Sequence, residues 1–280
     1  MNEVVNFIND LAKRSIEANK ANGGDYYDDS GLLVCGVCHT RKQCKFTLLG
    51  EEITAGCSCQ CEIEKEKAKK AERERAEREK RIKELRKAGF PESNMQNWTF
   101  ANDDMGTPKI TQAMQKYVDD FEKFLKTGQG LLLYGSTGTG KTFAACEVAN
   151  ALIDKGYPVL VTNFARFINT LQGTFEKQKF IDSLNQFQLI VIDDLGTERD
   201  TPFAREQVFN IIDSRYRAGS PMIITTNLSS DEIKKAGDVE NKRIYDRILE
   251  RCFPIEVTGN NRRIKAVRER YNEMKDLLGL

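Results

Sequence analysis

The stretch from Gly135 to Thr142 constrains this chain more than any other. It matches the pattern G-x-x-x-x-G-K-[ST] without a mismatch, with the residues Gly135, Ser136, Thr137, Gly138, Thr139, Gly140, Lys141 and Thr142. The three glycines let the backbone curl so that its N–H groups face a polyanion. An apolar run at 131–134 precedes the stretch and a helical pattern follows it, which disfavours a chance match in a surface loop. The sequence therefore predicts a phosphate-binding loop between a buried strand and a helix.

Two residues of this loop have individual expected roles. Lys141 is expected to reach the β and γ oxygens of a bound nucleotide. The hydroxyl of Thr142 is expected to help hold a Mg²⁺ ion that keeps most of its waters. The helix that begins at Lys141 points the positive end of its dipole at the same place.

A second apolar run, 189–192, ends in two acids, Asp193 and Asp194. Open α/β sheets bind their ligands at the carboxyl ends of the strands. We therefore expect Asp193 to hold the water shell of Mg²⁺ and Asp194 to orient the attacking water. A further strand, 222–226, ends at Asn227, which is expected to contact the γ-phosphate or this water if its strand lies between the other two.

The remaining periodic segments predict an α/β domain with a five-stranded parallel sheet. Strands are expected at 131–134, 158–162, 189–194, 222–226 and 254–257. Further helices are expected at 117–125, 164–184 and 203–217. One strand is expected to separate the strand before the loop from the acid-bearing strand. Trp98 and Phe100 open this domain and are interpreted either as core residues or as neighbours of a bound adenine.

Six of the eight cysteines lie between residues 35 and 61, together with the only histidine. In a reducing compartment such clustering favours a metal site over disulfides. The segment Cys-Gly-Val-Cys has the spacing of a zinc knuckle, and a second pair must come from Cys-Ser-Cys-Gln-Cys at 57–61. The predicted ligands of a structural zinc ion are Cys35, Cys38, Cys59 and Cys61.

A small hairpin is expected between the two cysteine pairs, because residues 46–54 contain apolar and β-branched side chains. Such a ribbon brings two ligand pairs into one tetrahedron. The alternative zinc ligands left open are His39, Cys44 and Cys57.

The region from residue 62 to 87 is highly charged, with 12 Lys or Arg and 8 Glu and neither Gly nor Pro. Its acid–base pairs at i,i+4 predict a solvated helix. A nucleic-acid-binding face is the less favoured interpretation, since Glu is interleaved throughout. The helix predicted at 3–19 either packs on its neighbour or docks on a partner. The expected division is an N-terminal module at 1–61, a helical linker at 62–89 and an ATPase-like domain at 90–280.

The formal net charge of +1 argues against nucleic-acid binding by overall basicity, so that any polyanion site must be local. The sequence has no run of 18 apolar residues and no signal-peptide pattern at its start. We therefore expect a soluble, cytoplasmic protein without membrane contact.

Several segments together resemble the AAA+ replicative helicase loaders of the DnaC and DnaI type, of which the transposition helper IstB is a close relative. They are the phosphate-binding loop, Ile-Asp-Asp-Leu-Gly-Thr-Glu at 192–198, Ile-Thr-Thr-Asn-Leu at 224–228, Ile-Tyr-Asp-Arg-Ile at 244–248 and Thr-Gly-Asn-Asn-Arg-Arg at 258–263. The resemblance covers about 90 to 270 and implies an AAA+ P-loop NTPase fold with ATPase activity. The cysteine-rich N-terminus is similar to the DnaI side of the family, where a zinc-bearing domain engages the helicase.

The resemblance implies roles for residues that spacing alone does not assign. Arg247 matches the arginine finger, which acts on the neighbouring subunit's phosphates. No partner for Arg247 is evident in its own sequence. Arg262 matches sensor 2, which reads the γ-phosphate within the same subunit, and Asn227 falls at sensor 1. Two departures are Asp194, where many AAA+ proteins have Glu, and the tail of about 20 residues after the last strand, which predicts a truncated lid.

The sequence thus predicts an ATP-dependent loader of a hexameric replicative DNA helicase onto single-stranded DNA. Its expected cofactors are ATP, Mg²⁺ and Zn²⁺, and it is expected to self-associate through the ATP site while the N-terminal module grips the helicase. Two alternatives are kept. One is a transposition helper of the IstB type, and the other is a zinc-dependent DNA-binding adaptor whose nucleotide site is only a switch.

Overall fold

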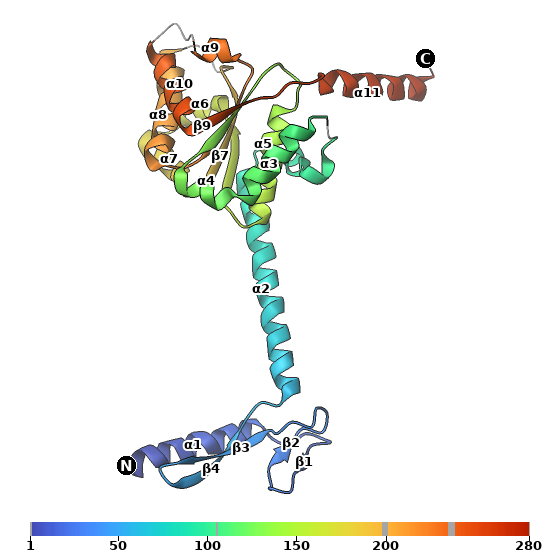
Figure 1. Ribbon diagram of the computed structural model, residues 1–280, viewed down its shortest axis with the longest axis vertical. Coiled ribbons are helices and arrows are strands. Elements are labelled where there is room, and N and C mark those ends of the chain that lie inside the picture. Colours follow the sequence, from blue (N-terminus) through green and yellow to red (C-terminus); the bar gives the residue numbers. More distant parts are fainter. Residues whose placement is uncertain (1, 105, 198–200, 235–238, 280) are drawn as a thin grey trace. The chain divides into compact units, whose positions relative to one another are not determined.

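The computed structural model describes residues 2–104, 106–197, 201–234 and 239–279 (Figure 1). The chain divides into two compact units, Met1–Glu79 and Lys80–Leu280. Among the described residues, no helix is both long enough and apolar enough to cross a membrane.

The first unit contains one helix, two short antiparallel strand pairs and the beginning of a long helix. Its elements are α1 (Asn2–Ala18), β1 (Tyr26–Tyr27), β2 (Leu33–Val34), β3 (Gln43–Leu48), β4 (Glu51–Gly56) and the first part of α2 (Gln60–Gly89). Strand β1 pairs with β2, and β3 pairs with β4. Leu49 and Gly50 connect β3 to β4 with φ angles of 51° and 89°, as a type I′ turn requires. The hairpin predicted between the cysteine pairs is confirmed.

Helix α1 packs against β4 at close range. The Gly56 N–H donates to the Ser15 hydroxyl at 2.8 Å. A Cβ atom at Gly56 would lie only 2.3 Å from the Ser15 carbonyl oxygen, so a larger residue would separate the two elements. Ala12 and Ile53 are buried, whereas Phe7 is exposed. The N-terminal helix therefore packs on its own unit, which is one of the two interpretations of its sequence.

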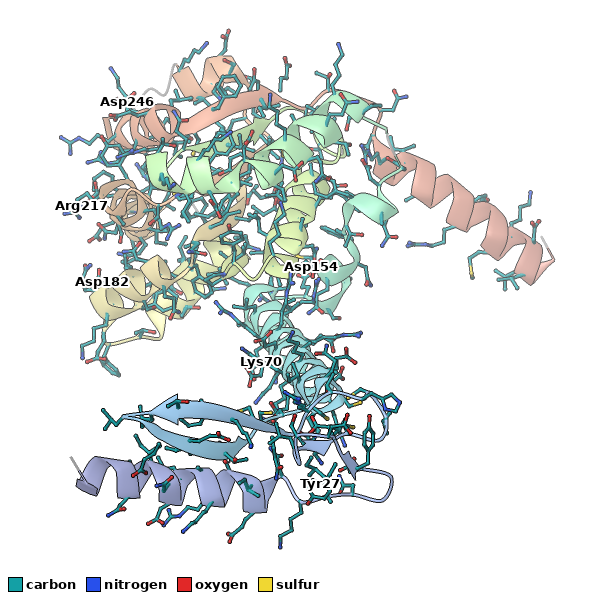
Figure 2. All side chains as sticks on the ribbon, turned by 60° about the horizontal axis from the view of Figure 1, so that its bottom comes forward. Tyr27, Lys70, Asp154, Asp182, Arg217 and Asp246 are labelled. Atoms are coloured by element: carbon teal, nitrogen blue, oxygen red, sulfur yellow. The ribbon has the colours of Figure 1, made fainter. Side chains whose placement is uncertain are left out.

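Helix α2 (Gln60–Gly89) is the charged helix predicted from residue 62 to 87. Lys70, labelled in Figure 2, has an 80% exposed side chain and lies 4.0 Å from Glu74. Arg75 donates to Glu79 at 2.9 Å. Exposed i,i+4 pairs of this kind stabilise a helix by about 0.3 to 0.5 kcal/mol each. The prediction of a solvated helix is confirmed.

The second unit is built on a five-stranded parallel sheet in the order β6-β7-β8-β5-β9. The strands are β5 (Gly130–Tyr134), β6 (Val159–Asn163), β7 (Leu189–Leu195), β8 (Met222–Thr226) and β9 (Cys252–Glu256). Strand β8 lies between β5 and β7, as the sequence predicts. The carboxyl ends of β5, β7 and β8 therefore lie side by side.

Helices cover both faces of this sheet (Figure 1). They are α3 (Pro108–Asp119), α4 (Phe121–Thr127), α5 (Lys141–Asp154), α6 (Phe164–Gln172), α7 (Lys177–Ser183), α8 (Pro202–Ala218), α9 (Ser230–Lys234) and α10 (Val239–Arg251). Helix α11 (Arg262–Leu278) extends away from the sheet (Figure 1). Short 3₁₀ turns occur at Ser93–Asn97, Phe100–Asn102 and Leu184–Gln186. Leu131 and Leu133 pack with α3, α4 and α5, whereas Leu132 packs with α6, α8 and α10. This alternation explains why the strands are apolar throughout.

Two predicted helices are each split in the structure. The segment predicted at 117–125 breaks at Asp120, where φ is −96° and ψ is 14°, into α3 and α4. The break lets the Tyr117 ring stack on Phe124 at 4.5 Å between centroids. The segment predicted at 164–184 is interrupted after Gln172, because Gly173 ends α6 before α7 begins at Lys177.

Candidate functional site

The phosphate-binding loop connects β5 to α5 and has three glycines with positive φ. These angles are 133° at Gly135, 83° at Gly138 and 100° at Gly140. A Cβ atom at Gly138 would lie 2.1 Å from Oδ1 of Asn261. Strain and lack of space therefore both require glycine at this position. The Gly138 carbonyl oxygen also accepts from the backbone N–H of Arg262 at 2.9 Å, which ties the start of α11 to the loop.

Lys141, the first residue of α5, is buried under the loop. Its Nζ atom donates to the carbonyl oxygens of Gly135 and Ser136, each at 2.8 Å. It also donates to Oδ1 of Asn227 at 2.8 Å. The ammonium group is thus held at the loop by neutral oxygens, which a phosphate oxygen can replace with a stronger charge-assisted bond. The predicted proximity of Asn227 to the loop is present.

Asp193 and Asp194 lie at the end of β7, where a register shift relative to β8 falls between Ile192 and Leu195. Asp194 has a φ of 57°, an uncommon value for a residue with a side chain. Its N–H donates to the Thr225 hydroxyl at 3.0 Å, and that hydroxyl donates to Asp193 at 2.5 Å. The bulge thereby turns two consecutive carboxylates toward the same end of the sheet.

The Asp193 carboxyl group is suited to hold a cation. Burial raises its pKa, while hydrogen bonds from Thr225 and Thr142 lower it. The hydroxyl of Thr142 and a carboxylate oxygen of Asp193 thus lie together, and Mg²⁺ prefers oxygen ligands of these two kinds. When bound, the ion would neutralise phosphate charge at this point.

A cavity of about 220 Å³ opens beside the loop. It is lined by Trp98, Thr137, Gly138, Gly140, Lys141, Thr142, Phe143, Asp194, Asn227 and Arg262. The Trp98 and Phe143 rings stack with centroids 5.8 Å apart. Asn150 donates to the carbonyl oxygen of Trp98 at 2.9 Å and so anchors this segment on α5. The cavity therefore combines polar groups for phosphates with an aromatic wall for a base, and Phe100 packs against the core instead.

Arg262 reaches the cavity from the start of α11. Its Nη1 atom lies 3.3 Å from Asp103 and 2.9 Å from Asp104, and its Nη2 atom donates to Thr107 at 3.0 Å. The segment that contributes Trp98 to the cavity therefore also holds this arginine. The guanidinium lies close to Gly140, where a Cβ atom would be 3.0 Å from its central carbon.

Glu147 is a buried acid on α5, and one of its carboxylate oxygens has no hydrogen-bond partner among the described residues. The pKa of Glu147 is raised to about 8, mainly by burial and also by the nearby charges of Asp103 and Asp104, while Arg262 lowers it. Glu147 therefore carries its proton at neutral pH. This keeps an additional negative charge away from the phosphate-binding cavity.

Arg247 lies on α10 and contacts α8. Its Nε atom donates to Oδ1 of Asp213 at 2.7 Å. The expectation that this arginine has no partner in its own chain is wrong, since the sequence does not show which face of α8 packs on α10.

Sequence reasoning missed four residues of the site, of which three give no sufficient signal in the sequence. The position of Thr225 in an apolar strand predicts only a strand residue, whereas its hydroxyl donates to Asp193. Asp103 and Asp104 lie far from Arg262 in sequence and meet it only through folding. Phe143 follows Thr142 directly, so its proximity to the loop could have been predicted from position alone.

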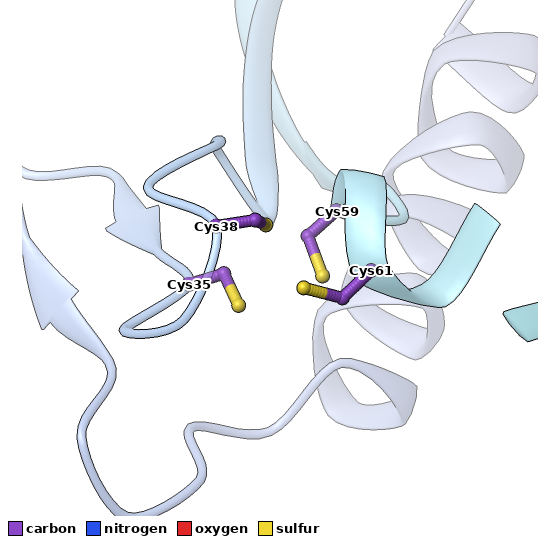
Figure 3. Close-up of side chains that lie close together, drawn as sticks. All are labelled: Cys35, Cys38, Cys59 and Cys61. Atoms are coloured by element: carbon purple, nitrogen blue, oxygen red, sulfur yellow. The ribbon is translucent and has the colours of Figure 1, made fainter. Parts of the chain in front are cut away.

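The first unit contains a second candidate site, formed by Cys35, Cys38, Cys59 and Cys61. Their sulfur atoms all lie within 4.8 Å of one another. Figure 3 shows one pair on the loop after β2 and the other at the start of α2, with the sulfur atoms converging. In tetrahedral zinc coordination with Zn–S bonds of about 2.3 Å, adjacent sulfurs are about 3.8 Å apart. The cluster therefore fits a zinc ion, and the four cysteines chosen from the sequence are those that converge.

The pKa values of these thiols show why a cation suits the cluster. A hydrogen bond from Thr40 lowers the pKa of Cys38 to about 5. The pKa of Cys61 is raised to about 12, mainly by its hydrogen bond with Cys38, and burial raises that of Cys59. Four neighbouring thiolates repel one another, and a divalent metal ion offsets this repulsion.

The alternative ligands lie outside this cluster. Nδ1 of His39 is 3.3 Å from the Tyr26 hydroxyl. Cys44 belongs to β3 and is exposed, and the Cys57 thiol contacts the Arg41 carbonyl oxygen at 3.5 Å. Within the described residues, these three are not part of the metal-ligand cluster.

A family model for IstB-like ATP binding proteins matches residues 52–270, which is more than half of the chain. This chain belongs to the family of IstB-like ATP binding proteins. The family match and the parallel sheet with its phosphate-binding loop together make the second unit a P-loop ATPase domain of the IstB-like family.

Two curated relatives of this IstB-like protein are replicative helicase loaders. DnaI of Bacillus subtilis (strain 168) is 28% identical over 202 residues, which cover 67% of this chain and 65% of DnaI. DnaC of Escherichia coli (strain K12) is 25% identical over 184 residues, which cover 61% of this chain and 72% of DnaC. The match thus spans slightly less than two thirds of the length of DnaI.

Among solved structures, the crystal structure of DnaI superposes on this IstB-like protein with a TM-score of 0.53. The aligned residues are 23% identical and cover 64% of this chain and 98% of the DnaI chain. This likeness supports the fold of the IstB-like domain.

Proposed function

We propose that this protein is an ATP-dependent loader that places a hexameric replicative DNA helicase onto single-stranded DNA. The observation that carries the proposal is the combination of a complete phosphate-binding site with the two loader relatives, DnaI and DnaC. In this proposal Lys141 binds the β and γ oxygens, Asp193 and Thr142 hold Mg²⁺, and Asp194 orients the attacking water. Asn227 and Arg262 contact the γ-phosphate.

In the proposed mechanism the site is completed by a second copy of the chain. Arg247 lies on α10, whereas the cavity residues come from the segment with Trp98, the phosphate-binding loop, α5, the end of β7, the residue after β8 and the start of α11. An arginine supplied in trans stabilises charge on the transferring phosphoryl group. ATP binding would thereby join subunits through this site, and DNA bound along the assembly would stimulate hydrolysis.

The cysteine-rich unit is proposed to bind zinc and to contact the helicase. Its four-sulfur cluster and its own buried residues indicate a separate folding unit. Exposed apolar side chains on this unit, Phe7, Leu11, Tyr27 and Val37, offer contact area for a partner protein. In this proposal residues 1–61 contact the helicase, residues 62–89 form a helical linker and residues 90–280 hydrolyse ATP.

The first experiment tests whether the chain binds a replicative helicase. The full chain and the host replicative helicase are mixed and separated by size exclusion, with and without ATP. A stable complex, together with ATP turnover that rises when single-stranded DNA is added, is the expected result. No complex with the helicase, or turnover indifferent to DNA, would remove the loader assignment.

A second candidate is a transposition helper of the IstB type, because the chain belongs to the IstB-like family. It would share the ATPase site but partner a transposase. The same size-exclusion assay with a transposase in place of the helicase separates the two. If the chain binds ATP without DNA-stimulated turnover, the adaptor with a nucleotide switch is favoured over both.

The second experiment tests the action of Arg247 in trans. Arg247→Ala subunits keep an intact phosphate-binding loop, and Lys141→Ala subunits keep the arginine. Each variant alone is expected to be inactive, and their mixture is expected to recover ATPase activity. Failure of the mixture to recover would remove the intersubunit part of the proposal.

A further inference from the structure

One face of α8 carries the residues that surround Arg247. Phe209, Asp213 and Tyr216 are spaced by four and three residues and therefore lie on one side of the helix. The Arg247 guanidinium lies over the Phe209 ring at 4.6 Å and over the Tyr216 ring at 5.7 Å from the centroids. Its Nε atom donates to Oδ1 of Asp213 at 2.7 Å. An acid and two aromatic faces thus enclose the side chain.

The ion pair uses the nitrogen closest to the stem of the arginine. The two terminal nitrogens, which can hold a phosphoryl group bidentately, lie beyond it. Of these, Nη1 makes a long contact of 3.4 Å to the carbonyl oxygen of Arg243. The Arg247 side chain retains 29% exposure, whereas the Asp213 side chain retains only 11%. The arrangement therefore fixes the base of the guanidinium and leaves its outer edge accessible.

Such fixation matters because a free arginine side chain loses rotamer entropy when it is ordered. A side chain already held in its reaching conformation loses less of this entropy when it meets a phosphate. Transition-state stabilisation by charge depends on groups placed before the reaction occurs.

We propose that Asp213 is a positioning residue that, with Phe209 and Tyr216, holds Arg247 ready for the ATP site of the neighbouring subunit. This inference rests on the proposed action of Arg247 in trans. Asp213 itself touches neither nucleotide nor phosphate. Its effect is on the rate of hydrolysis in the assembled protein, not on nucleotide binding by the subunit that carries it.

The structure offers a matched control on the same carboxylate. Nη2 of Arg217 lies 2.5 Å from Oδ2 of Asp213, the oxygen that Arg247 does not use. Arg217, labelled in Figure 2, has a 74% exposed side chain. An Arg217→Ala variant therefore removes an ion pair from Asp213 while the contact with Arg247 stays in place.

The experiment uses mixtures in which one subunit lacks the arginine and the other supplies it. The recipient is Arg247→Ala, and the reference donor is Lys141→Ala. Three further donors combine Lys141→Ala with Asp213→Ala, Asp213→Asn or Arg217→Ala. The recovered kcat of each mixture is measured at saturating ATP, and the KM for ATP is measured in parallel.

The Asp213→Ala donor is expected to recover at least about tenfold less kcat than the reference donor, with KM within about twofold, because a tenfold change corresponds to about 1.4 kcal/mol of lost transition-state stabilisation. The Asp213→Asn donor is expected to be intermediate, since its amide oxygen still accepts from Nε but carries no charge. The Arg217→Ala donor is expected to equal the reference.

Distinct outcomes overturn the inference and the proposed function. If the reference donor recovers activity and the Asp213→Ala and Asp213→Asn donors recover equally well, Asp213 only joins α8 to α10 and the positioning role is lost. If the reference donor itself recovers nothing, the action of Arg247 in trans fails first. Thermal unfolding of the single Asp213 variants checks that they fold, and the isosteric Asp213→Asn variant decides the case if Asp213→Ala does not.

Discussion

The two units of this chain differ in the interactions that stabilise them. The second unit buries two clusters of apolar side chains, one on each face of its sheet. The first unit buries few apolar residues besides Leu32, Leu33, Val34 and Ile53, and it adds a buried ion pair in which Lys42 lies 3.0 Å from Asp25. A unit of this size rarely folds on such a core without a metal ion or a disulfide. The comparison supports the proposal that a bound metal ion holds the first unit together, whereas apolar burial stabilises the second.

The largest effect is expected when the four-cysteine cluster of the first unit is removed. A Cys59→Ser variant, or prolonged chelation of the wild type, is expected to unfold the first unit, because structural zinc contributes about 10 kcal/mol or more of folding free energy. Zinc content and far-UV circular dichroism measure the loss. Nucleotide binding by the second unit should persist. The control is Cys44→Ser, which alters an exposed cysteine outside the cluster and should keep its zinc.

The next perturbation is a substitution in the phosphate-binding loop of the second unit. Lys141→Ala is expected to lower ATP turnover by at least about 100-fold, the scale seen when one preorganised charge-stabilising group is lost. Zinc content and the secondary structure of the first unit should not change. Lys179→Ala, which removes an exposed lysine on α7, serves as the control. Zinc loss in the Lys141 variant would show that the two units do not fold independently.

A smaller effect concerns the buried acid of the second unit. The pKa of Glu147 is about 8 in the folded protein and 4.5 in the unfolded chain, so the folded state keeps a proton that the unfolded state releases. Between these pH values stability is expected to fall with rising pH by up to about 1.4 kcal/mol per unit. A Glu147→Gln variant lacks this contribution.

Denaturant unfolding at pH 5, 6, 7 and 8 measures the effect of Glu147. The stability of the Gln variant relative to wild type should rise steadily over this range and level off above pH 8. A constant difference across the range would show that Glu147 is ionised in the folded protein.

The smallest expected effect lies on the exposed surface of α2. Arg75→Ala breaks the contact with Glu79, yet exposed pairs of this type contribute only about 0.3 to 0.5 kcal/mol, and alanine has the highest helix propensity. We expect a change in unfolding free energy below about 0.5 kcal/mol. A larger loss, measured by thermal unfolding at low salt, would reveal that this part of α2 contributes to the stability of the first unit.

Much of the ATPase domain could be predicted because its signals are local. Three glycines, a lysine and a threonine in fixed spacing specify the loop, and unbroken apolar runs specify strands buried on both faces. The breaks at Asp120 and Gly173 could not be predicted with the same ease. Neither lies at a proline, and the stacking of Tyr117 on Phe124 depends on tertiary packing.

The site itself shows the same division between local and long-range information. A rule about strand ends predicts that Asp193 and Asn227 lie beside the loop, and the structure brings them to Thr142 and Lys141. The partners of Arg247 and Arg262 were missed, because Asp213, Asp103 and Asp104 lie 34 to 159 residues away in sequence. No spacing rule connects residues across that distance.

The chemical groups that the chain can offer follow directly from its sequence. The sequence specified the phosphate-binding loop, the two acids that end a buried strand and the four thiols with metal-ligand spacing, because each depends on residue type over a short distance. The orientation of these groups depends on the tertiary structure. The tertiary structure placed Trp98 against Phe143, joined Arg262 to the lead-in segment and set Arg247 against Asp213. Orientation arises from helix packing and strand order, and these depend on contacts between segments distant in sequence.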